Sequence, residues 1–147
     1  MKEERFKVCC AVYIIIRQEN KILFLKRQNT GYMDGFYALP AGHLEDGETF
    51  FEAVIREAKE ELNITIQEKD LNLVFTGNQV APNKEYIDLF FEIKNFSGIL
   101  KNNEPEKSSE LDFFEFNNIK NKVIPYTAKV LTEIENKNNC FVFKTDY

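Results

Sequence analysis

Residues 42–64, GHLEDGETFFEAVIREAKEELNI, decide the expected fold. The segment begins as a loop rich in glycine and acidic residues and continues into a helix. Thr49 and Glu52 have the S/T-x-x-E spacing of a capping box, so we expect the helix to begin near Phe50. Asn63 tolerates the left-handed backbone conformation that often ends a helix, and we expect the helix to stop there.

This helix is expected to carry an apolar stripe beside an acidic patch. The stripe has the i, i+3, i+4, i+7 spacing of a helix that packs on a core, and it consists of Phe51, Val54, Ile55, Ala58 and Leu62. At 100° per residue, Glu57, Glu60 and Glu61 share an arc of about 100°. Arg56 cannot neutralise all three carboxylates, whereas a hard divalent cation such as Mg²⁺ can. A solvated acidic face is the alternative interpretation.

The composition indicates a globular protein with an acidic balance. At 147 residues we expect one domain, residues 1–147, because a chain of this length can bury a substantial core. The 19 basic and 24 acidic residues give a formal net charge of −5. This balance disfavours binding to a nucleic-acid polymer, which requires a basic surface. It still permits a phosphorylated small molecule, provided that metal ions bridge the two.

Cysteine usage and hydropathy predict a cytoplasmic protein. Cys9, Cys10 and Cys140 are odd in number and have no CxxC spacing, so we expect reduced, buried thiols. The first ten residues mix acids with bases and do not resemble a signal peptide. No apolar run is long enough to span a membrane, and no membrane partner is expected.

The order of the expected elements indicates an α/β (α+β) fold. We expect strands within residues 6–17, 22–26, 64–75, 86–93, 111–116 and 140–144, with the first two forming a hairpin. Residues 36–45 read as a short extended segment, and residues 97–110 as a loop. A second helix is expected within residues 117–136, with Pro125 near its first turn. Several strands precede the first helix, which predicts a mixed sheet between helices and not a doubly wound parallel sheet.

The opening segment resembles the Nudix box. Gly42 is followed after five residues by Glu48, and after seven more by the run Arg56-Glu57-Ala58-Lys59-Glu60-Glu61-Leu62-Asn63-Ile64. The one departure is Asn63, which stands where the pattern has glycine. More loosely, Arg27 with residues 29–35, residues 39–42 and residues 104–107 are similar to segments of small bacterial MutT-like Nudix enzymes. The resemblance implies the Nudix α/β/α sandwich with a mixed β-sheet.

The resemblance also implies roles for the box residues. Glu57, Glu60, Glu61 and the carbonyl of Gly42 would bind Mg²⁺ (or Mn²⁺), and the three glutamates with Arg56 would form the catalytic group. We expect Arg56 to hold box acids such as Glu48 or Glu60 in place. The general base is left open between a box glutamate and a loop acid, Glu104 or Glu106.

Residues outside the box are candidates for substrate binding. His43 is the only histidine and adjoins Gly42, and Arg27 ends a strand, so each could contact phosphate. Phe36 could stack on a base, as could Tyr37, Tyr86 and Phe113, although core packing is the commoner role of such rings.

The activity implied by the resemblance is hydrolysis of a small nucleotide by water attack on phosphorus. The leading hypothesis is a metal-dependent pyrophosphohydrolase acting on a nucleoside triphosphate or a related nucleoside diphosphate-X compound. The alternatives are an ADP-ribose or nucleotide-sugar hydrolase and a non-catalytic, nucleotide-sensing Nudix module. The sequence does not determine the oligomeric state, and a homodimer is left open because many relatives are dimers.

Overall fold

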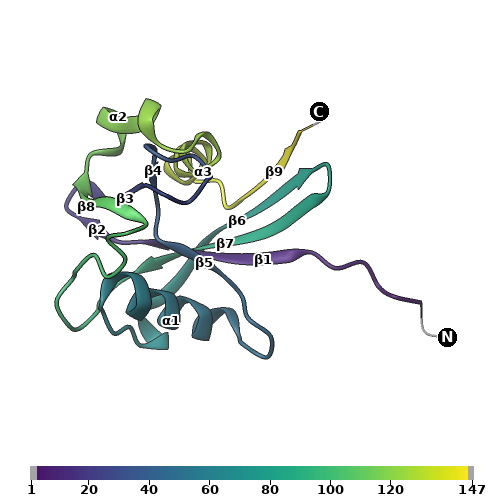
Figure 1. Cartoon of the computed structure of the whole chain (residues 1–147), viewed down its shortest axis with the longest axis horizontal. Coiled ribbons are helices and arrows are strands. Elements are labelled where there is room, and N and C mark those ends of the chain that lie inside the picture. The colour runs from purple at the N-terminus through teal and green to yellow at the C-terminus, as the bar shows by residue number, and fades with distance from the viewer. Residues whose placement is uncertain (1–2, 146–147) are drawn as a thin grey trace.

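A five-stranded mixed sheet forms the centre of the computed structural model, which describes residues 3–145 (Figure 1). Its strands lie in the order β5 (Ala41–His43), β1 (Cys9–Ile15), β7 (Lys84–Ile93), β6 (Leu71–Ala81) and β9 (Cys140–Lys144). Strand β1 runs parallel to β7, and β6 runs parallel to β9, whereas β1–β5 and β6–β7 are antiparallel. The mixed sheet expected from the order of elements is therefore confirmed.

A second sheet, which the sequence did not predict, is built around β3 (Lys21–Arg27). Strand β3 pairs antiparallel with β2 (Arg17–Gln18), β4 (Tyr37–Ala38) and β8 (Ser108–Phe114). The hairpin expected between residues 6–17 and 22–26 is wrong except at its tip, where β2 pairs with β3. Strand β1 enters the other sheet because it is apolar on both faces, and a central position between two helices buries both.

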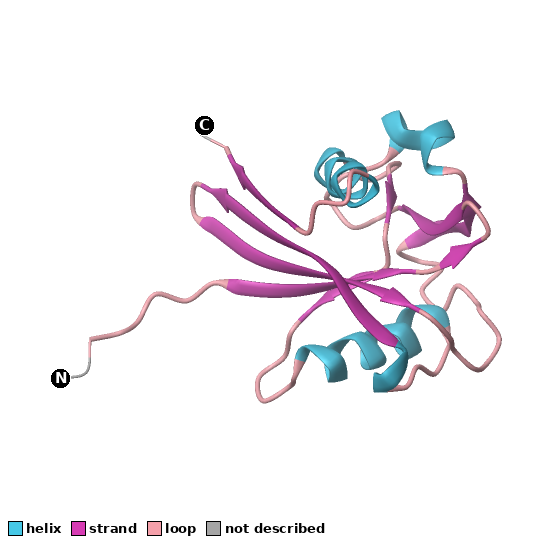
Figure 2. Cartoon of the chain, turned by 180° about the vertical axis from the view of Figure 1, so that it is seen from behind, coloured by secondary structure: helices cyan, strands magenta, loops and turns pink. Residues whose placement is uncertain are grey.

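The long helices cover opposite faces of the five-stranded sheet (Figures 1 and 2). Helix α1 (Phe50–Leu62) shares a core with Val12, Ile14 and Phe91, whereas α3 (Pro125–Glu135) shares a second core with Phe75 and Phe90. Helix α2 (Phe116–Ile119) and the 3₁₀ turns η1 (Glu68–Asp70) and η2 (Lys120–Lys122) complete the chain. These layers form the expected α/β/α sandwich.

Both ends of α1 have the predicted structure. The Thr49 hydroxyl accepts a hydrogen bond from the Glu52 N–H at 3.2 Å, and the Glu52 carboxylate accepts one from the Thr49 N–H at 2.8 Å. Asn63 adopts a left-handed conformation with φ 60° and ψ 27°. Its N–H donates to the carbonyls of Ala58 and Lys59. Asparagine therefore caps the end of the helix at the position where the box pattern has glycine.

Several expected boundaries are shifted. The strand expected within residues 64–75 is β6, which continues to Ala81 and forms a long hairpin with β7 through Asn83, at φ 64°. The strand expected at residues 111–116 begins three residues earlier, at Ser108, and Phe116 instead begins α2. Strand β8 begins earlier than expected because a backbone hydrogen bond between Gln28 and Lys107 holds the preceding loop next to the end of β3.

Two further expectations can be compared with the described residues. The cysteines are free, but their expected burial is wrong, because Cys9 and Cys140 are exposed and Cys10 is half-buried. Within residues 3–145, no helix combines the length and apolar character needed to cross a membrane.

Candidate active site

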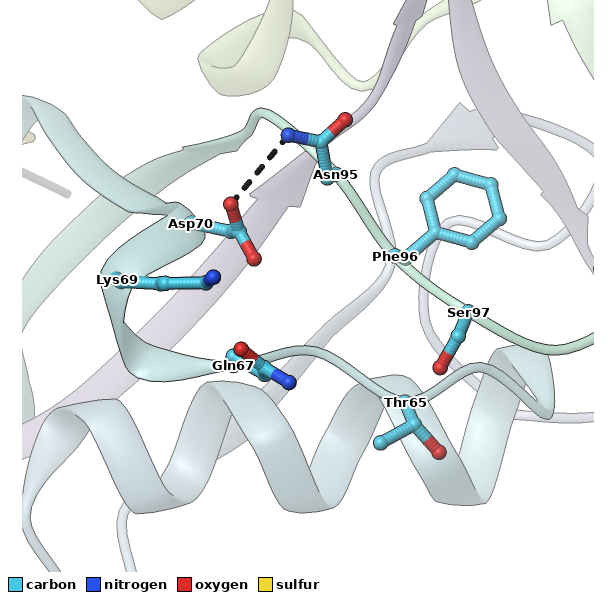
Figure 3. Close-up of a pocket in the computed structure, with 7 residues that line it drawn as sticks. All are labelled: Thr65, Gln67, Lys69, Asp70, Asn95, Phe96 and Ser97. Atoms are coloured by element: carbon cyan, nitrogen blue, oxygen red, sulfur yellow. Dashed lines mark hydrogen bonds between the residues drawn. The ribbon is translucent and has the colours of Figure 1, made fainter.

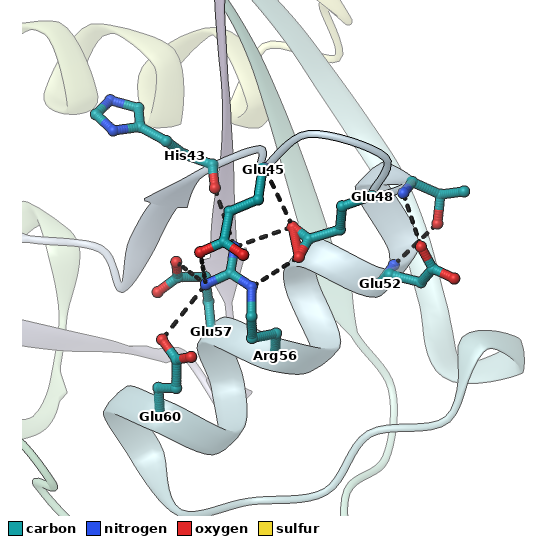
Figure 4. A network of polar contacts seen from close by, with 8 residues as sticks. His43, Glu45, Glu48, Glu52, Arg56, Glu57 and Glu60 are labelled. Atoms are coloured by element: carbon teal, nitrogen blue, oxygen red, sulfur yellow. Dashed lines mark hydrogen bonds and ion pairs between the residues drawn. The ribbon is translucent and has the colours of Figure 1, made fainter.

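Arg56 is the centre of the polar network on α1 (Figure 4). Its guanidinium forms a bidentate pair with Glu48, Nε to Oε2 at 2.7 Å and Nη2 to Oε1 at 2.9 Å. Nη1 donates to Glu57 at 2.7 Å and to Glu60 at 3.3 Å, and Nη2 donates to the His43 carbonyl at 3.0 Å. One cation therefore connects the box loop to the helix acids, and both contacts expected of Arg56, to Glu48 and to Glu60, are present.

The acidic patch is not the solvated face that the helical wheel allowed. The Glu60 side chain is 54% exposed, but Glu57 is 8% exposed and Glu61 is half-buried. Burial raises the pKa of Glu57, and the hydrogen bond from Arg56 counteracts only part of this effect. In contrast, hydrogen bonds from Arg56 hold the pKa of Glu48 below its usual range. The helix thus directs two of its three acids toward the sheet.

Glu61 has the most perturbed carboxyl group of the cluster. Burial, together with the neighbouring charges of Glu57 and Glu104, raises its pKa to about 9. A hydrogen bond with Glu57 acts in the same direction, whereas the Ala41 backbone N–H donates to Glu61 and favours its charged form. Glu57 and Glu61 are therefore close neighbours that resist holding two negative charges without a cation.

Gly42 allows the Glu57 carboxylate to lie directly against β5. A Cβ atom at position 42 would lie 1.9 Å from Glu57 Oε1 and 2.0 Å from Glu57 Cδ, so no other residue fits without displacing the carboxylate. The structure therefore brings together Gly42, Glu57 and Glu61, as the sequence predicted, with Glu60 at the exposed margin.

This donor set fits a hard divalent cation. Carboxylate and carbonyl oxygens are the ligands that Mg²⁺ and Mn²⁺ prefer, and crowded acids are stabilised by a positive charge. Within residues 3–145, no three acidic, histidine or cysteine side chains are gathered into a complete metal cage. Instead, Arg56 Nη1 contacts both Glu57 and Glu60 and supplies the positive charge between them.

The two loop acids left open by the sequence have different positions. Glu104 lies near enough to Glu61 to raise the pKa of that carboxyl group, and the Asn103 N–H donates to the Glu61 carbonyl at 3.0 Å. Glu106 is exposed, and its backbone carbonyl accepts from the Asn29 side chain at 3.1 Å. The fold therefore brings Glu104, and not Glu106, to the acidic cluster.

The predicted substrate-binding residues are scattered around this cluster. Arg27 donates to the Tyr32 carbonyl at 2.8 Å and to Thr30 Oγ1 at 2.9 Å, so its guanidinium organises its own loop. Phe36 is half-buried at the end of that loop, and its ring stacks on no other ring within residues 3–145. The His43 ring points away from the acids and lies 5.6 Å from the ring centroid of Tyr86 (Figure 4).

Two residues that were not predicted from the sequence, Tyr32 and Lys84, lie beside these side chains. The Lys84 ammonium lies over the rings of both Tyr32 and Tyr86. The turn residues Pro82 and Asn83 could have placed Lys84 at a hairpin tip. Nothing local in the sequence indicates that this tip meets the loop after β3.

Two surface hollows lie at opposite ends of α1. One, of about 560 Å³, is lined by residues 8–10 of β1 and its approach and by residues 43–48 of the box loop, next to Arg56 and Glu57. The other, of about 250 Å³, is shallow and lies between the segment that follows α1 and residues 95–97, where Asp70 and Phe96 line it (Figure 3). Of the two, the first is lined by residues that contact Arg56, namely His43 and Glu48.

Fold and site together define a Nudix protein. The family model for the Nudix domain matches residues 8–134, and the chain belongs to this family. The match includes the box, every strand of the five-stranded sheet except β9, and most of α3.

Particular relatives share parts of the chain. It is 39% identical over 109 residues to an ADP-ribose pyrophosphatase from Methanocaldococcus jannaschii, which covers 74% of this chain and 63% of that protein. It is 39% identical over 61 residues to an 8-oxo-dGTP diphosphatase from Escherichia coli, or 42% of this chain and 47% of that protein. The chain thus aligns with less than two thirds of the length of either relative.

Solved structures agree on the fold. A MutT Nudix hydrolase from Burkholderia pseudomallei superposes with a TM-score of 0.76 at 22% identity, covering 86% of this chain and 98% of that one. At this identity the likeness establishes the architecture alone.

Proposed function

We propose that this chain is a divalent-metal-dependent pyrophosphohydrolase that cleaves a nucleoside diphosphate linked to a further group. The observation that carries the proposal is the packing of the Glu57 carboxylate against Gly42, with Glu61 beside it and Arg56 between Glu57 and Glu60. Carboxylates that are buried close together, with one arginine to balance their negative charges, are expected at functional sites.

Each residue of the cluster has a proposed role. Glu57, Glu60, Glu61 and the Gly42 carbonyl would hold Mg²⁺ or Mn²⁺, which neutralises phosphate charge and lowers the pKa of a bound water. Arg56 keeps Glu48 and the box loop fixed to the helix, so that the acids stay in register. Glu104, near Glu61, is the candidate general base from outside the box.

Two substrate classes remain, and each has a separate basis. The resemblance of the box and its flanking segments to MutT-like enzymes favours a nucleoside triphosphate. The longer alignment, over 74% of the chain, is to a protein named for ADP-ribose. Both classes are small nucleotides.

Three expectations from the sequence stay predictions. They are a single domain over residues 1–147, a cytoplasmic location and a homodimer.

The test is a substrate panel with a matched pair of variants. The protein is incubated with nucleoside triphosphates, 8-oxo-dGTP and ADP-ribose in Mg²⁺ or Mn²⁺, and the release of phosphate, pyrophosphate or nucleoside monophosphate is measured. Glu60→Gln, at an exposed position, should lower kcat by about 100-fold or more. Glu135→Gln, at the exposed end of α3, is the control and should leave kcat unchanged.

The possible outcomes are distinct. Turnover that needs the metal and is lost in Glu60→Gln supports the proposal. Absence of turnover on the whole panel would support the non-catalytic alternative, and equal activity in the two variants would overturn the metal assignment.

A further inference from the structure

Within residues 3–145, no helix covers the α1 side of the five-stranded sheet near the β6–β7 turn. Helix α1 packs on the part of the sheet that contains Val12 and Ile14, whereas β1, β6 and β7 continue past the helix (Figures 1 and 2). On the opposite side of the sheet, Phe141 and Phe143 of β9 pack against the core that α3 shares. The same region of sheet is therefore covered on its α3 side and bare on its α1 side.

The side chains on the bare side are mostly apolar. Val142 is 67% exposed, and Ile87 and Val80 are half-buried without joining either of the two cores. They lie on the α1 side because Ile87 is paired with Cys10, which is two residues from the buried Val12 on the same side of β1. The strand registers place five residues together as one surface, here called the uncovered face: Cys10, Ile87, Asn78, Val80 and Val142.

The N-terminal arm, residues 3–8, carries the same pattern beyond the sheet. It is extended and leaves the body of the protein as the continuation of β1 (Figures 1 and 2). Phe6 and Val8 alternate with Arg5 and Lys7, which is the period of a strand with one apolar side. Phe6 is 75% exposed and Val8 is 38% exposed. In an extended chain this alternation places both on the side of the uncovered face.

The backbone of the arm also lacks a partner. Strand β1 pairs with β7 from Cys9 onward and with β5 from Ala11 onward. On the β5 side, the Leu44 N–H donates to the Cys10 carbonyl at 2.9 Å. Within residues 3–145, no strand pairs with the chain before Cys9. An extended segment with free backbone groups and one apolar side is a template for pairing with another chain.

The balance of charge on this surface favours a second copy of the chain as the partner. Glu85 and Lys144 flank Val80 in its row across the strands, one of each sign. The arm carries two acidic and two basic residues between positions 3 and 8. The surface therefore has no net charge, although the chain carries −5. Two copies can meet through it without the repulsion that an acidic surface would produce.

The available area fits a dimer only when the arms take part. Four strands and about three rows of residues give the uncovered face an area of roughly 300 Å². A stable interface buries about 800 Å² on each partner. An extended arm over residues 3–8 adds about 20 Å of chain from each copy. Exchange of the arms supplies contact area that the uncovered face does not provide alone.

We propose that the uncovered face and the N-terminal arm form the interface of a homodimer, in which the two uncovered faces pack together and each arm lies along the partner. This proposal goes beyond the proposed function and does not depend on metal or substrate. It has one consequence for the candidate active site. The 560 Å³ hollow has Val8 and Cys10 on one side and residues 43–48 of the box loop on the other, so the interface borders this hollow.

The experiment measures the molar mass of the full chain in solution. Light scattering after size-exclusion chromatography, in EDTA and without nucleotide, should give about twice the 17.3 kDa of one chain at micromolar concentration. Sedimentation velocity over a dilution series then gives the dissociation constant of the dimer.

Three variants locate the interface. Phe6→Glu and Val142→Glu should each raise the dissociation constant at least about tenfold, because a two-fold interface contains each new charge twice. Both side chains are exposed in the single chain, so thermal unfolding should show that each variant still folds. Ile99→Glu is the control and should leave the dimer unchanged. Ile99 is 81% exposed and lies at the carboxyl end of α1, where its carbonyl accepts from the Asn63 side chain at 3.1 Å.

The outcomes are distinct from those of the substrate panel. Dissociation of Phe6→Glu and Val142→Glu with an intact Ile99→Glu dimer would support the interface whether or not any nucleotide is hydrolysed. A monomeric unchanged chain would overturn the proposal and leave the uncovered face to a different protein. A dimer that is equally tight in all three variants would overturn it by placing the interface elsewhere, and so would an equal weakening in Ile99→Glu.

Discussion

The two faces of the five-stranded sheet each bury an acid beside a glycine, but the surroundings of these acids differ. On the α1 face, the Glu57 carboxylate packs against Gly42 and contacts Arg56. On the α3 face, Asp88 is fully buried opposite Gly77, and its carboxylate accepts a hydrogen bond from the neutral Gln79 side chain at 2.6 Å. Burial raises the pKa of both acids.

The difference lies in what can reach each acid. Glu57 belongs to a group that extends to the exposed Glu60 and to Glu61, so a cation from solvent can replace the contact with Arg56. Asp88 is sealed beneath Tyr126, whose hydroxyl would lie 2.1 Å from a Cβ at position 77. A buried acid therefore indicates metal chemistry only where further acids connect it to solvent. The Asp88 carboxylate instead lies inside the core, between Gln79 and Tyr126 of α3.

Exchanging the two glycines for alanine should produce the largest difference between the faces. Gly42→Ala displaces the Glu57 carboxylate and should lower kcat by about 100-fold or more, with a modest effect on folding. Gly77→Ala forces the Tyr126 hydroxyl away from the sheet and should destabilise the fold by about 1–3 kcal/mol. Its Mn²⁺ affinity per folded molecule should not change.

Steady-state kinetics and urea unfolding of both variants provide the measurements. If Gly77→Ala lost metal binding as completely as Gly42→Ala, the assignment of the metal site to the α1 face alone would be refuted.

The free energy of unfolding should depend on pH because the pKa of Glu61 is raised in the folded chain. Its pKa is raised from the ordinary value of 4.5 to about 9, so the folded chain retains a proton that the unfolded chain loses. The free energy of unfolding of the metal-free protein should therefore fall as the pH rises from about 5 to about 9. Saturating Mg²⁺ should reduce this fall, because a cation replaces the proton.

Urea unfolding at several pH values, in EDTA and in Mg²⁺, measures this effect. Glu61→Gln cannot ionise and should show a smaller fall in EDTA. An identical pH slope in the variant would mean that Glu61 is already charged in the metal-free protein.

The smallest effect is expected from the sealed acid. Asp88→Asn keeps the shape of the side chain and an oxygen that can accept from Gln79, so the free energy of unfolding near pH 7 should change by no more than about 1 kcal/mol. Thermal unfolding of Asp88→Asn, Glu61→Gln and the unchanged chain compares their free energies of unfolding. A loss above about 3 kcal/mol would show that the Asp88 charge itself holds α3 in place.

The sequence predicted the parts of the molecule that local rules determine. The capping box at Thr49, the stop at Asn63 and the common direction of Glu57 and Glu61 depend on helix geometry alone. The partition of β1 and β3 into different sheets was missed, because it depends on which strands are buried on both faces. The choice of Glu104 over Glu106, and the approach of Lys84 to Tyr32, likewise depend on loops that meet only in three dimensions.

The proposed metal site is tested by Mn²⁺ binding to the folded protein, followed by electron paramagnetic resonance. We expect the unchanged chain and Asp88→Asn to bind Mn²⁺ with the same Kd, whereas Glu57→Gln should raise the Kd by at least about tenfold. Equal Mn²⁺ affinity in Glu57→Gln and the unchanged chain would contradict the claim that the acids packed against Gly42 form the metal site.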